Sequence, residues 1–374
     1  MIRKANIRLG KTDLPEQAWF RRRLQAWFHL HQRPLPWRKN RDPYRIWISE
    51  IMLQQTQVAT VIPYFQRFLK FFPTIRALAL ASEHDVLRLW EGLGYYRRAR
   101  DLRRAARQLV ADHDGQFPRD PEVLAALPGF GRYTVGAVLS QAFDCRLPIV
   151  ETNSMRVLCR WFGLKGEPRS GLNRRKVWRL AEGLLPSRRV GEFNQALMEL
   201  GALVCSPLAP RCRDCPLAKH CRARRLGLQE RIPPRPATVA IQEIEEFAMV
   251  VYRGKKVLLV QRPADGRWAN MWEFPHAPLE QGESATAAGK RMLVERTGIR
   301  VTPGKEILTL RHGITRYRIT MVCLAARYKS GRFSSHVYQQ GKWVTLEELV
   351  NYPVSAPQRR LARALTKDER KQAI

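Results

Sequence analysis

The sequence predicts an all-α domain followed by an α+β domain. Apolar residues recur at helical spacing up to about residue 228, whereas beyond it they fall into short runs typical of strands. At 374 residues the chain has the length of about two domains. We therefore expect the helical domain at 1–227, a linker at 228–243, the α+β domain at 244–356 and a basic tail at 357–374.

The helical elements are predicted from apolar stripes and start signals. Asp120 followed by Pro121 is typical of an N-cap and a first helical position. Small and apolar residues predict helices over 134–142 and 193–204, and the second leads into a cysteine-rich segment. One apolar stripe, beside a run of arginines, consists of Leu102, Ala105, Ala106, Leu109 and Val110.

Proline and strand signals mark the second half. The segment RIPPRPA at 231–237 contains three prolines and predicts a stiff linker rather than a packed element. Apolar runs at 247–252 and 257–261 flank Arg253-Gly-Lys-Lys256 and predict a hairpin. Two further elements are expected, a helix at 285–296 and a strand at 317–325.

The net charge of the chain indicates which class of molecule it binds. Lysine and arginine number 66 against 33 acidic residues, a formal net charge of +33, which favours a polyanion such as nucleic acid. The sequence has no apolar run of about 18 residues that would span a membrane. Its basic N-terminal segment lacks the apolar core of a signal peptide. We expect a cytoplasmic protein.

Four cysteines with the spacing C-x6-C-x2-C-x5-C indicate a metal centre at Cys205, Cys212, Cys215 and Cys221. The spacing leaves two kinds of centre open, a structural zinc ion or an iron–sulfur cluster with four thiolate ligands. A disulfide knot is not favoured, because seven cysteines in 374 residues are few and odd in number.

A glycine-containing turn precedes the helix expected at 134–142. In Leu127-Pro-Gly-Phe-Gly-Arg-Tyr133, Gly129 and Gly131 allow the backbone to approach a ligand closely, and free N–H groups at a helix start favour an anion. An ordinary glycine turn would look the same in isolation. On this basic chain we expect the anion to be a DNA phosphate, contacted without reading the base sequence.

Two carboxylates could supply chemistry. Glu50 lies in an otherwise apolar and amide-rich segment, where burial would raise its pKa and let it act as an acid near neutral pH. Glu151 follows an apolar stretch. Facing one glycosidic bond, one carboxyl could protonate the leaving group while the other stabilises an oxocarbenium-like centre. The alternative is that both are surface charges or helix caps.

Together these motifs resemble a known family. The hairpin, the carboxylate after it and the cysteine spacing resemble the helix-hairpin-helix DNA glycosylases of the endonuclease III superfamily. Two segments resemble the MutY branch, the adenine DNA glycosylases, namely LPWRKNRDPYRIWISEIMLQQTQVATVIPYF at 35–65 and LWEGLGYYRRAR at 89–100. The resemblance covers about residues 18–225 and, more weakly, the second domain. It implies a 4Fe-4S cluster on the four cysteines and removal of adenine mispaired with 8-oxoguanine or guanine from double-stranded DNA, by a monomer.

The resemblance also implies roles for single residues. Glu50 would protonate an adenine flipped out of the duplex, because the glycosidic bond is inaccessible in the stack. Tyr133 occupies the place of a Schiff-base lysine in bifunctional relatives, which implies a monofunctional glycosylase. Asn153 matches the family's active-site asparagine, and Arg38 matches an arginine lining the adenine pocket.

Further residues match the family's DNA contacts. Gln55 and Tyr95 match residues that wedge into the duplex beside the lesion. Thr56 lies in the same segment as Gln55 and is expected to contact DNA. Glu151 departs from the family, which carries aspartate there; one extra methylene could misplace the carboxylate by about 1 Å, although the surrounding motif is kept. We expect activity to be retained.

The second domain resembles a Nudix fold. Trp272-Glu-Phe-Pro275 and later positions fit the Nudix box, but Ala277, Met292 and Arg296 replace a glycine and two glutamates of that box. A magnesium site of oxygen ligands is not expected to survive this loss. The resemblance implies a non-hydrolytic module that inspects the base opposite adenine, and Thr315 and Arg316 lie where the family has its recognition loop.

Two alternatives remain beside adenine removal. A related helix-hairpin-helix glycosylase could act on another mismatched or oxidised base, although Tyr133 and the segment MLQQTQ weigh against it. The altered residues Glu151, Thr315 and Arg316 would also suit a catalytically weakened lesion-binding protein.

Overall fold

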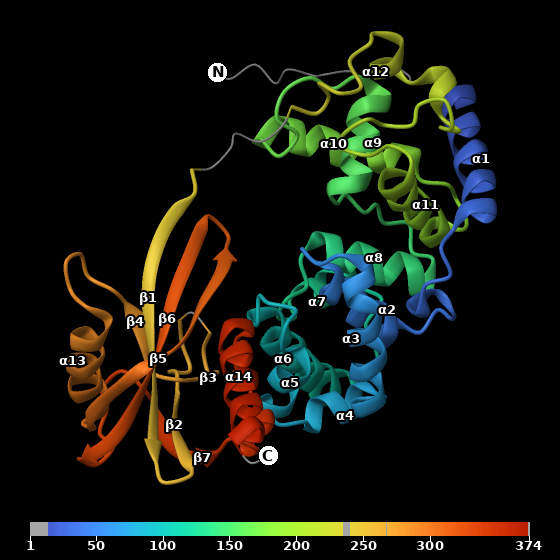
Figure 1. The fold of residues 1–374 in the computed structure, drawn as a ribbon. Helices are drawn as coiled ribbons and strands as arrows, with labels where there is room; N and C mark the ends of the chain where they lie inside the picture. Colours follow the sequence, from blue (N-terminus) through green and yellow to red (C-terminus); the bar gives the residue numbers. More distant parts are fainter. Residues whose placement is uncertain (1–13, 235–239, 267, 373–374) are drawn as a thin grey trace, which may run out of the picture. The chain divides into compact units, whose positions relative to one another are not determined.

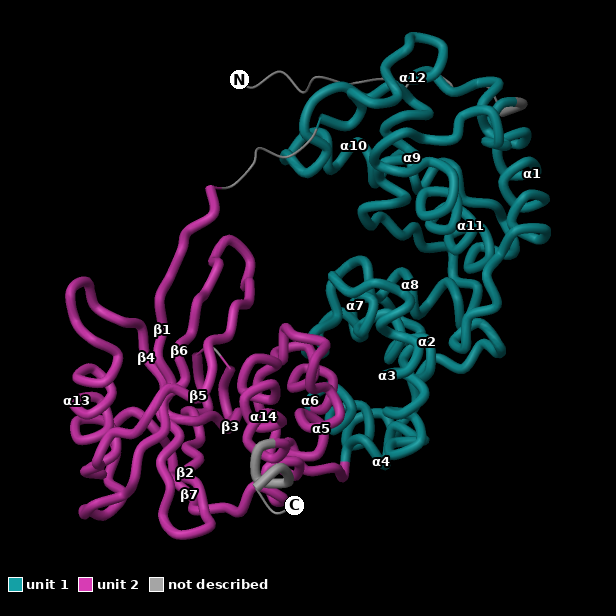
Figure 2. Tube along the Cα trace, in the orientation of Figure 1, with its two compact units in different colours: residues 1–79, 104–237 teal, residues 80–103, 238–374 magenta. Residues whose placement is uncertain are grey.

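The chain divides into two compact units (Figure 2), one of residues 1–79 and 104–237, the other of residues 80–103 and 238–374. The computed structural model describes residues 14–234, 240–266 and 268–372. Helices make up the described part of the first unit, and the second contains the sheet, so the predicted all-α and α+β classes are confirmed. Residues 80–103, expected with the helical domain, group instead with the α+β unit because they pack against its final helix.

The first unit starts its helices where the sequence places start signals. Asp120 caps α7 by accepting a hydrogen bond from the N–H of Glu122 at 2.8 Å, and Pro121 is the first helical residue. Helices predicted at 134–142 and 193–204 are α8 and α11. The elements of this unit are α1 (Leu14–His31), η1 (Pro36–Arg38), α2 (Pro43–Leu53), α3 (Val58–Phe71), α4 (Ile75–Leu80), α6 (Arg97–His113, shared with the second unit), α7 (Pro121–Ala125), α8 (Arg132–Phe143), α9 (Thr152–Phe162), α10 (Gly171–Leu184), α11 (Val190–Leu203), η2 (Ala218–His220) and α12 (Arg222–Arg225).

Glycines let the helices around α11 approach closely enough to fix the start of α9. A Cβ at Gly201 of α11 would lie 2.7 Å from the Cβ of Asn153. A Cβ at Gly136 of α8 would lie 2.6 Å from the carbonyl oxygen of Pro148, just before α9. Because real Cβ atoms do not approach so closely, these contacts require glycine. They hold the N-terminal end of α9 against α8 and α11.

The second unit contains a seven-stranded sheet in the order β3-β2-β1-β6-β5, with β4 paired to β1 and β7 to β2. The predicted hairpin is confirmed: Arg253 pairs with Lys256 across a two-residue turn. The strand expected at 317–325 is β6, and the helix expected at 285–296 is α13. The elements are α5 (Glu83–Trp90), β1 (Gln242–Arg253), β2 (Lys256–Gln261), β3 (Trp272–Glu273), β4 (His276–Pro278), α13 (Ala285–Thr297), β5 (Arg300–Ile314), β6 (Tyr317–Ser330), β7 (Gln340–Thr345), η3 (Glu348–Asn351) and α14 (Ala356–Gln372).

The sheet is covered on both faces, by α13 on one and α14 on the other (Figure 1). Alternate residues of β1 separate between the two cores, as the period of a strand requires. Ala248 and Val250 pack in the core with α14, whereas Phe247, Met249 and Val251 pack in the core with α13.

Two segments that were expected to be loosely packed contain buried residues. The basic tail expected at 357–374 lies mostly in α14, in which Leu361, Ala362 and Leu365 are buried in a core of the sheet. Within the linker expected at 228–243, Ile232 is 3% exposed and its carbonyl accepts a hydrogen bond from Arg160 Nε at 2.8 Å. Its residues 235–239 lie outside the described part of the chain, and β1 already starts at Gln242. Among the described residues, no helix is long and apolar enough to cross a bilayer.

Candidate active site

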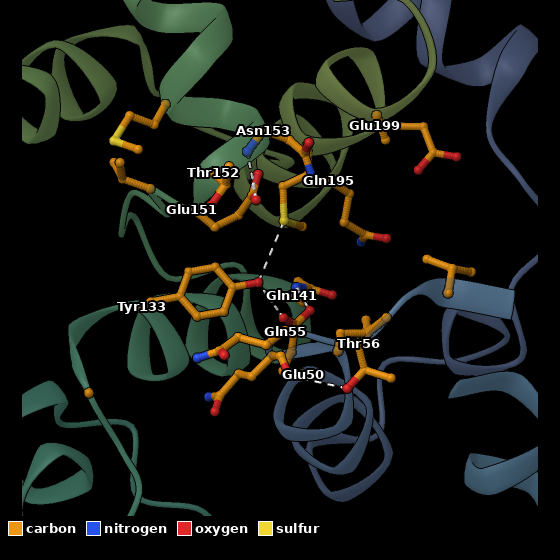
Figure 3. A pocket seen from close by; sticks show the side chains of 18 of the residues that line it. Glu50, Gln55, Thr56, Tyr133, Gln141, Glu151, Thr152, Asn153, Gln195 and Glu199 are labelled. Carbon is orange, nitrogen blue, oxygen red and sulfur yellow. Dashed lines mark hydrogen bonds between the residues drawn. The ribbon is translucent and has the colours of Figure 1, made fainter. Parts of the chain in front are cut away.

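A cleft of about 1050 Å³ in the first unit gathers most of the predicted site residues. Its walls come from α2 and the turn after it, the start of α8, the start of α9, and α11. Figure 3 shows these side chains, with Tyr133 between the α2 side and the α9 side. The predicted residues that line the cleft are Arg38, Glu50, Gln55, Thr56, Gly131, Tyr133, Glu151 and Asn153.

Glu50 is a buried carboxyl at the wall of this cleft, with 4% of its surface exposed. The hydroxyl of Tyr133 donates a hydrogen bond to its Oε2, and Gln141 Nε2 donates to its Oε1 at 3.0 Å. Both donors lie on α8, which packs against α2. Burial raises the pKa of Glu50, while these hydrogen bonds and the charge of Arg38 oppose the rise. A carboxyl in this setting can hold a proton and donate it to a ligand.

Glu199 on α11 lines the same cleft and is 1% exposed. It accepts hydrogen bonds from Arg33 Nε at 2.7 Å, Arg33 Nη2 at 2.8 Å and Arg38 Nη2 at 2.9 Å. The two guanidinium groups lower the pKa of Glu199 to about 2, against the effect of burial. This carboxylate therefore stays ionised and holds Arg38 at the cleft wall.

Glu199 and Gln141 are site residues that were not predicted from the sequence. For Glu199 a signal was present, because it is the one carboxylate in the apolar and amide-rich segment 193–204, much as Glu50 is in its own segment. Gln141 carried no comparable signal, since its partner Glu50 lies far away in the sequence.

Glu151 is the N-cap of α9. Its carboxylate accepts hydrogen bonds from the backbone N–H of Asn153 at 2.7 Å and of Ser154 at 2.6 Å, and the hydroxyl of Ser154 accepts one from the N–H of Glu151 at 2.9 Å. This is a capping box. Burial raises the pKa of Glu151, and the two N–H donors oppose the rise. The longer side chain thus fits a capping role while it still lines the cleft.

Arg156 links the start of α9 to the cysteine loop. Its Nη2 donates to Asn153 Oδ1 at 2.8 Å and to the carbonyl of Gly201 at 2.8 Å. Its Nε donates to the carbonyl of Cys205 at 2.7 Å. The buried guanidinium of Arg156 therefore fixes the side chain of Asn153, a predicted site residue.

The predicted hairpin turn has the conformation that its glycines allow. Gly129 has a φ of 79°, in the left-handed region. Gly131 is the N-cap of α8, and a Cβ there would meet nothing within 4 Å, so the start of this helix is open to an approaching ligand. Gly129 is not among the residues that line the cleft.

Two predicted DNA contacts share an unusual backbone conformation. Gln55 at the end of α2 has a φ of 57° and Tyr95 a φ of 48°, both left-handed. Such conformations cost energy in residues other than glycine and persist where the surroundings impose them. Gln55 is exposed at the cleft, and Tyr95, 52% exposed, belongs to the second unit.

Thr315 and Arg316 form a two-residue turn between β5 and β6 in the second unit, where Ile314 pairs with Tyr317. Thr315 has a φ of 52°. The guanidinium of Arg316 lies 5.2 Å from the ring centroid of Tyr317, and its Nη2 donates to the hydroxyl of that residue at 3.1 Å. Both turn residues are exposed.

The four predicted metal ligands line a small cavity of about 30 Å³. None of the four forms a disulfide. Within the described residues, no group of three or more His, Cys, Asp or Glu is placed to hold a single metal ion. Arg160 Nη1 donates to Cys205 Sγ at 3.2 Å. A thiol-lined cavity with a cation beside it suits an anionic centre with several thiolate ligands.

Known proteins resemble both parts of the chain. A family model described as HhH-GPD superfamily base excision DNA repair protein matches residues 48–182, and a NUDIX domain model matches residues 247–364. The adenine DNA glycosylase of Rattus norvegicus is 35% identical over 96% of this chain and 80% of its own length. The chain belongs to the adenine DNA glycosylase family.

Other members of the adenine DNA glycosylase family match two thirds or more of this chain. The one from Homo sapiens is 33% identical, covering 94% of this chain and 74% of its own. The one from Buchnera aphidicola (subsp. Schizaphis graminum) is 37% identical over 67% and 72%. The solved structure of a thermostable thymine-DNA glycosylase is 30% identical, with a TM-score of 0.53, and covers 57% of this chain and 98% of that one.

In this adenine DNA glycosylase family member, the residues of the Nudix box serve packing and surface ion pairs. Met292, which replaces a box glutamate, is 3% exposed in the core beneath α13. Arg291 pairs with Glu283 at 2.7 Å and with Glu295 at 3.6 Å. Ala277, at the position of a box glycine, is buried as well.

Proposed function

We propose that this chain removes adenine mispaired with 8-oxoguanine or guanine from double-stranded DNA, as a monofunctional glycosylase. The observation that carries the proposal is the state of Glu50, a buried carboxyl with a raised pKa at the wall of a cleft that also holds Glu151. Its support is the match to adenine DNA glycosylases over most of the chain.

In the proposed reaction, Glu50 gives its proton to a ring nitrogen of the flipped adenine. The bond between the base and the sugar C1′ then breaks, and its electron pair leaves with the base. The carboxylate of Glu151, oriented by the N–H groups at the start of α9, stabilises the cationic sugar. Water adds to C1′ and its proton returns to the carboxylate of Glu50, which leaves free adenine and an abasic site.

The cleft favours hydrolysis over a lyase reaction. A Schiff base requires a lysine amine. The described residues that line the cleft include no lysine, and the Tyr133 hydroxyl is bonded to Glu50. Burial and the Glu50 carboxylate keep the pKa of Tyr133 well above its usual range, so we assign it the role of orienting Glu50.

The substrate must enter the cleft flipped out of a duplex. We assign Gln55 and Tyr95 to wedging beside the lesion, Arg38 to lining the base pocket and Asn153 to contacting the sugar. Thr56, Gly129 and Gly131 would contact the phosphate backbone, which a net charge of +33 attracts. Thr315 and Arg316 would inspect the opposite base.

The four cysteines, all in the segment from the end of α11 to α12, would hold a 4Fe-4S cluster through their thiolates, which would cross-link this segment. Arg160, which donates to Cys205 Sγ, would hydrogen-bond to the ligand shell. We place the enzyme in a bacterial cytoplasm, on nucleoid DNA, as a monomer.

Single-turnover base release tests the proposal. The native protein and Glu50→Gln are compared on duplexes with A:8-oxoguanine, A:G and T:G pairs. We expect adenine release from the first two, none from T:G, and loss of release in Glu50→Gln. Thymine release would favour a glycosylase with another substrate, and tight binding without base release would favour a lesion-binding protein.

A further inference from the structure

The loop after α5, residues 91–96, is held by the α+β part of its own unit. It carries Tyr95, which is 52% exposed, and begins at Glu91, the C-cap of α5. Gly92, Gly94 and Tyr95 all have left-handed backbones, with φ of 97°, 69° and 48°. The two glycines adopt such backbones at little cost, whereas Tyr95 does not, so its conformation persists only where contacts impose it.

The strongest of these contacts is a bidentate ion pair between Glu91 and Arg359 of α14. Arg359 Nε lies 2.6 Å from Glu91 Oε1, and Arg359 Nη2 lies 2.8 Å from Glu91 Oε2. The two side chains are 15% and 12% exposed. Arg359 also donates to the carbonyls of Leu349 at 2.7 Å and Tyr352 at 2.6 Å, so its whole fork is used. Such a planar fork fixes direction as well as distance.

Further polar contacts reach the same short segment from the α+β part. The hydroxyl of Tyr96 donates to the carbonyl of Val354 at 3.4 Å. Arg100 Nη1, in the helix after the loop, donates to the carbonyl of Ala269 at 2.7 Å. In α5, Glu83 accepts from Asn270 Nδ2 at 2.7 Å. The α+β part therefore grips the loop before and after Tyr95.

On its inner side the loop is closed by its own neighbours. Trp90 Nε1 donates to the carbonyl of Gly94 at 3.1 Å. Arg98 Nη2 donates to the same carbonyl at 3.2 Å, and its guanidinium lies 5.6 Å from the ring centroid of Tyr95. These bonds fix the loop to its own helices, whereas Glu91 fixes it to α14.

We propose that Arg359 and Glu91 are positioning residues for DNA binding, through which the α+β part of the second unit sets the direction in which Tyr95 is presented to a duplex. The proposal rests on the proposed function in one respect, that the ligand of Tyr95 is mismatched DNA. In this role α14 supports the DNA-binding loop without itself touching DNA.

Hydrogen exchange of the free protein tests the positioning directly. Arg359→Ala is compared with Arg363→Ala, which removes the same charge from an exposed position of the same helix. We expect exchange in residues 91–98 to accelerate about tenfold or more in Arg359→Ala and to stay unchanged in Arg363→Ala. Equal protection in both variants would overturn the proposal.

A double-mutant cycle tests the consequence for DNA. Binding to a duplex with an A:G mismatch is measured for Arg359→Ala and Arg363→Ala, each with and without Tyr95→Ala. We expect Arg359→Ala to weaken binding about tenfold, the size of one lost stacking contact, and to have little further effect once Tyr95 is removed. An equal loss in both backgrounds would show that Arg359 does not act through Tyr95.

Two measures keep the test decisive. If Arg359→Ala unfolds, Arg359→Lys and Glu91→Gln replace it, since each breaks the bidentate geometry with a smaller change. Neither the binding measurement nor the exchange measurement depends on base release. A protein that shows the coupling but releases no adenine would therefore contradict the proposed function and leave the positioning role standing.

Discussion

Glu50 and Glu199 are both buried and line the same cleft (Figure 3). Their pKa values are nevertheless shifted in opposite directions. Glu50 faces a hydroxyl and an amide, and burial raises its pKa. Glu199 faces two guanidinium groups, which lower its pKa to about 2. Burial raises the pKa of both carboxyls, and only at Glu199 do neighbouring cations outweigh it. One cleft thus holds both a proton donor and a permanent anion.

Replacing Glu50 by Gln removes the proton donor of this pair of carboxyls. We expect adenine release to fall by at least about a hundredfold, since the amide cannot supply the proton. The measurement is single-turnover base release, with Glu182→Gln on the exposed face of α10 as the control. Binding to mismatched DNA should be kept, and a variant that still releases adenine at the native rate would remove Glu50 from the mechanism.

Replacing Glu199 by Gln removes the permanent negative charge from the cleft. Two partly buried guanidinium groups would lose a charged hydrogen-bond partner, which costs about 2 kcal/mol in the free energy of unfolding. The carboxylate has a folded pKa of about 2, below its usual 4.5, so its stabilising effect is complete above pH 4.5 and is lost as the pH falls toward 2. The stability difference from the native protein should therefore shrink over that range. A difference that is independent of pH would contradict the ion pair.

Glu151 adds a third carboxyl to the comparison. It accepts hydrogen bonds from backbone N–H groups instead of from side-chain cations. Glu151→Ala should lower the free energy of unfolding by about 1 kcal/mol through loss of the cap, and should also slow adenine release. Glu151→Asp restores the residue expected from the family resemblance and should retain release. Denaturant unfolding and single-turnover kinetics measure the two effects. An Asp variant much slower than the native protein would show that α9 is built for the longer side chain.

The smallest expected effect concerns Tyr133. Its hydroxyl lowers the pKa of Glu50, so Tyr133→Phe should raise that pKa further. Glu50 would then keep its proton to higher pH, and the decline of adenine release on the alkaline side should move to higher pH. The pH profile of single-turnover release measures this shift, with Tyr64→Phe on α3 as the control. A shift to lower pH would mean that the hydroxyl favours the protonated carboxyl.

Much of the fold could be predicted because its signals are local. Asp120 with Pro121 marks a helix start, and the runs on either side of Arg253 mark a hairpin. The role of α14 could not be predicted in this way. Its basic residues dominate the sequence, while the few apolar ones that enter the core, Leu361 and Leu365, gain their meaning from a sheet formed elsewhere in the chain.

In the candidate site too, residues in local motifs could be predicted, whereas residues that depend on distant partners could not. The cleft brings Glu50, Tyr133, Glu151 and Asn153 together, and each lies in a recognisable motif. Glu199 was missed because its charge matters through Arg33 and Arg38, which lie more than 160 residues before it. A single sequence does not say which cations a carboxylate will meet.

The burial of α14 has a consequence for how the chain is made. Residues 80–103 are synthesised early, yet the helix that holds them, with Arg359, is among the last described parts to emerge from the ribosome. The helical core can assemble as the chain appears, because parts nearer the N-terminus fold first. The loop that carries Tyr95 must wait for α14 before it takes its final shape.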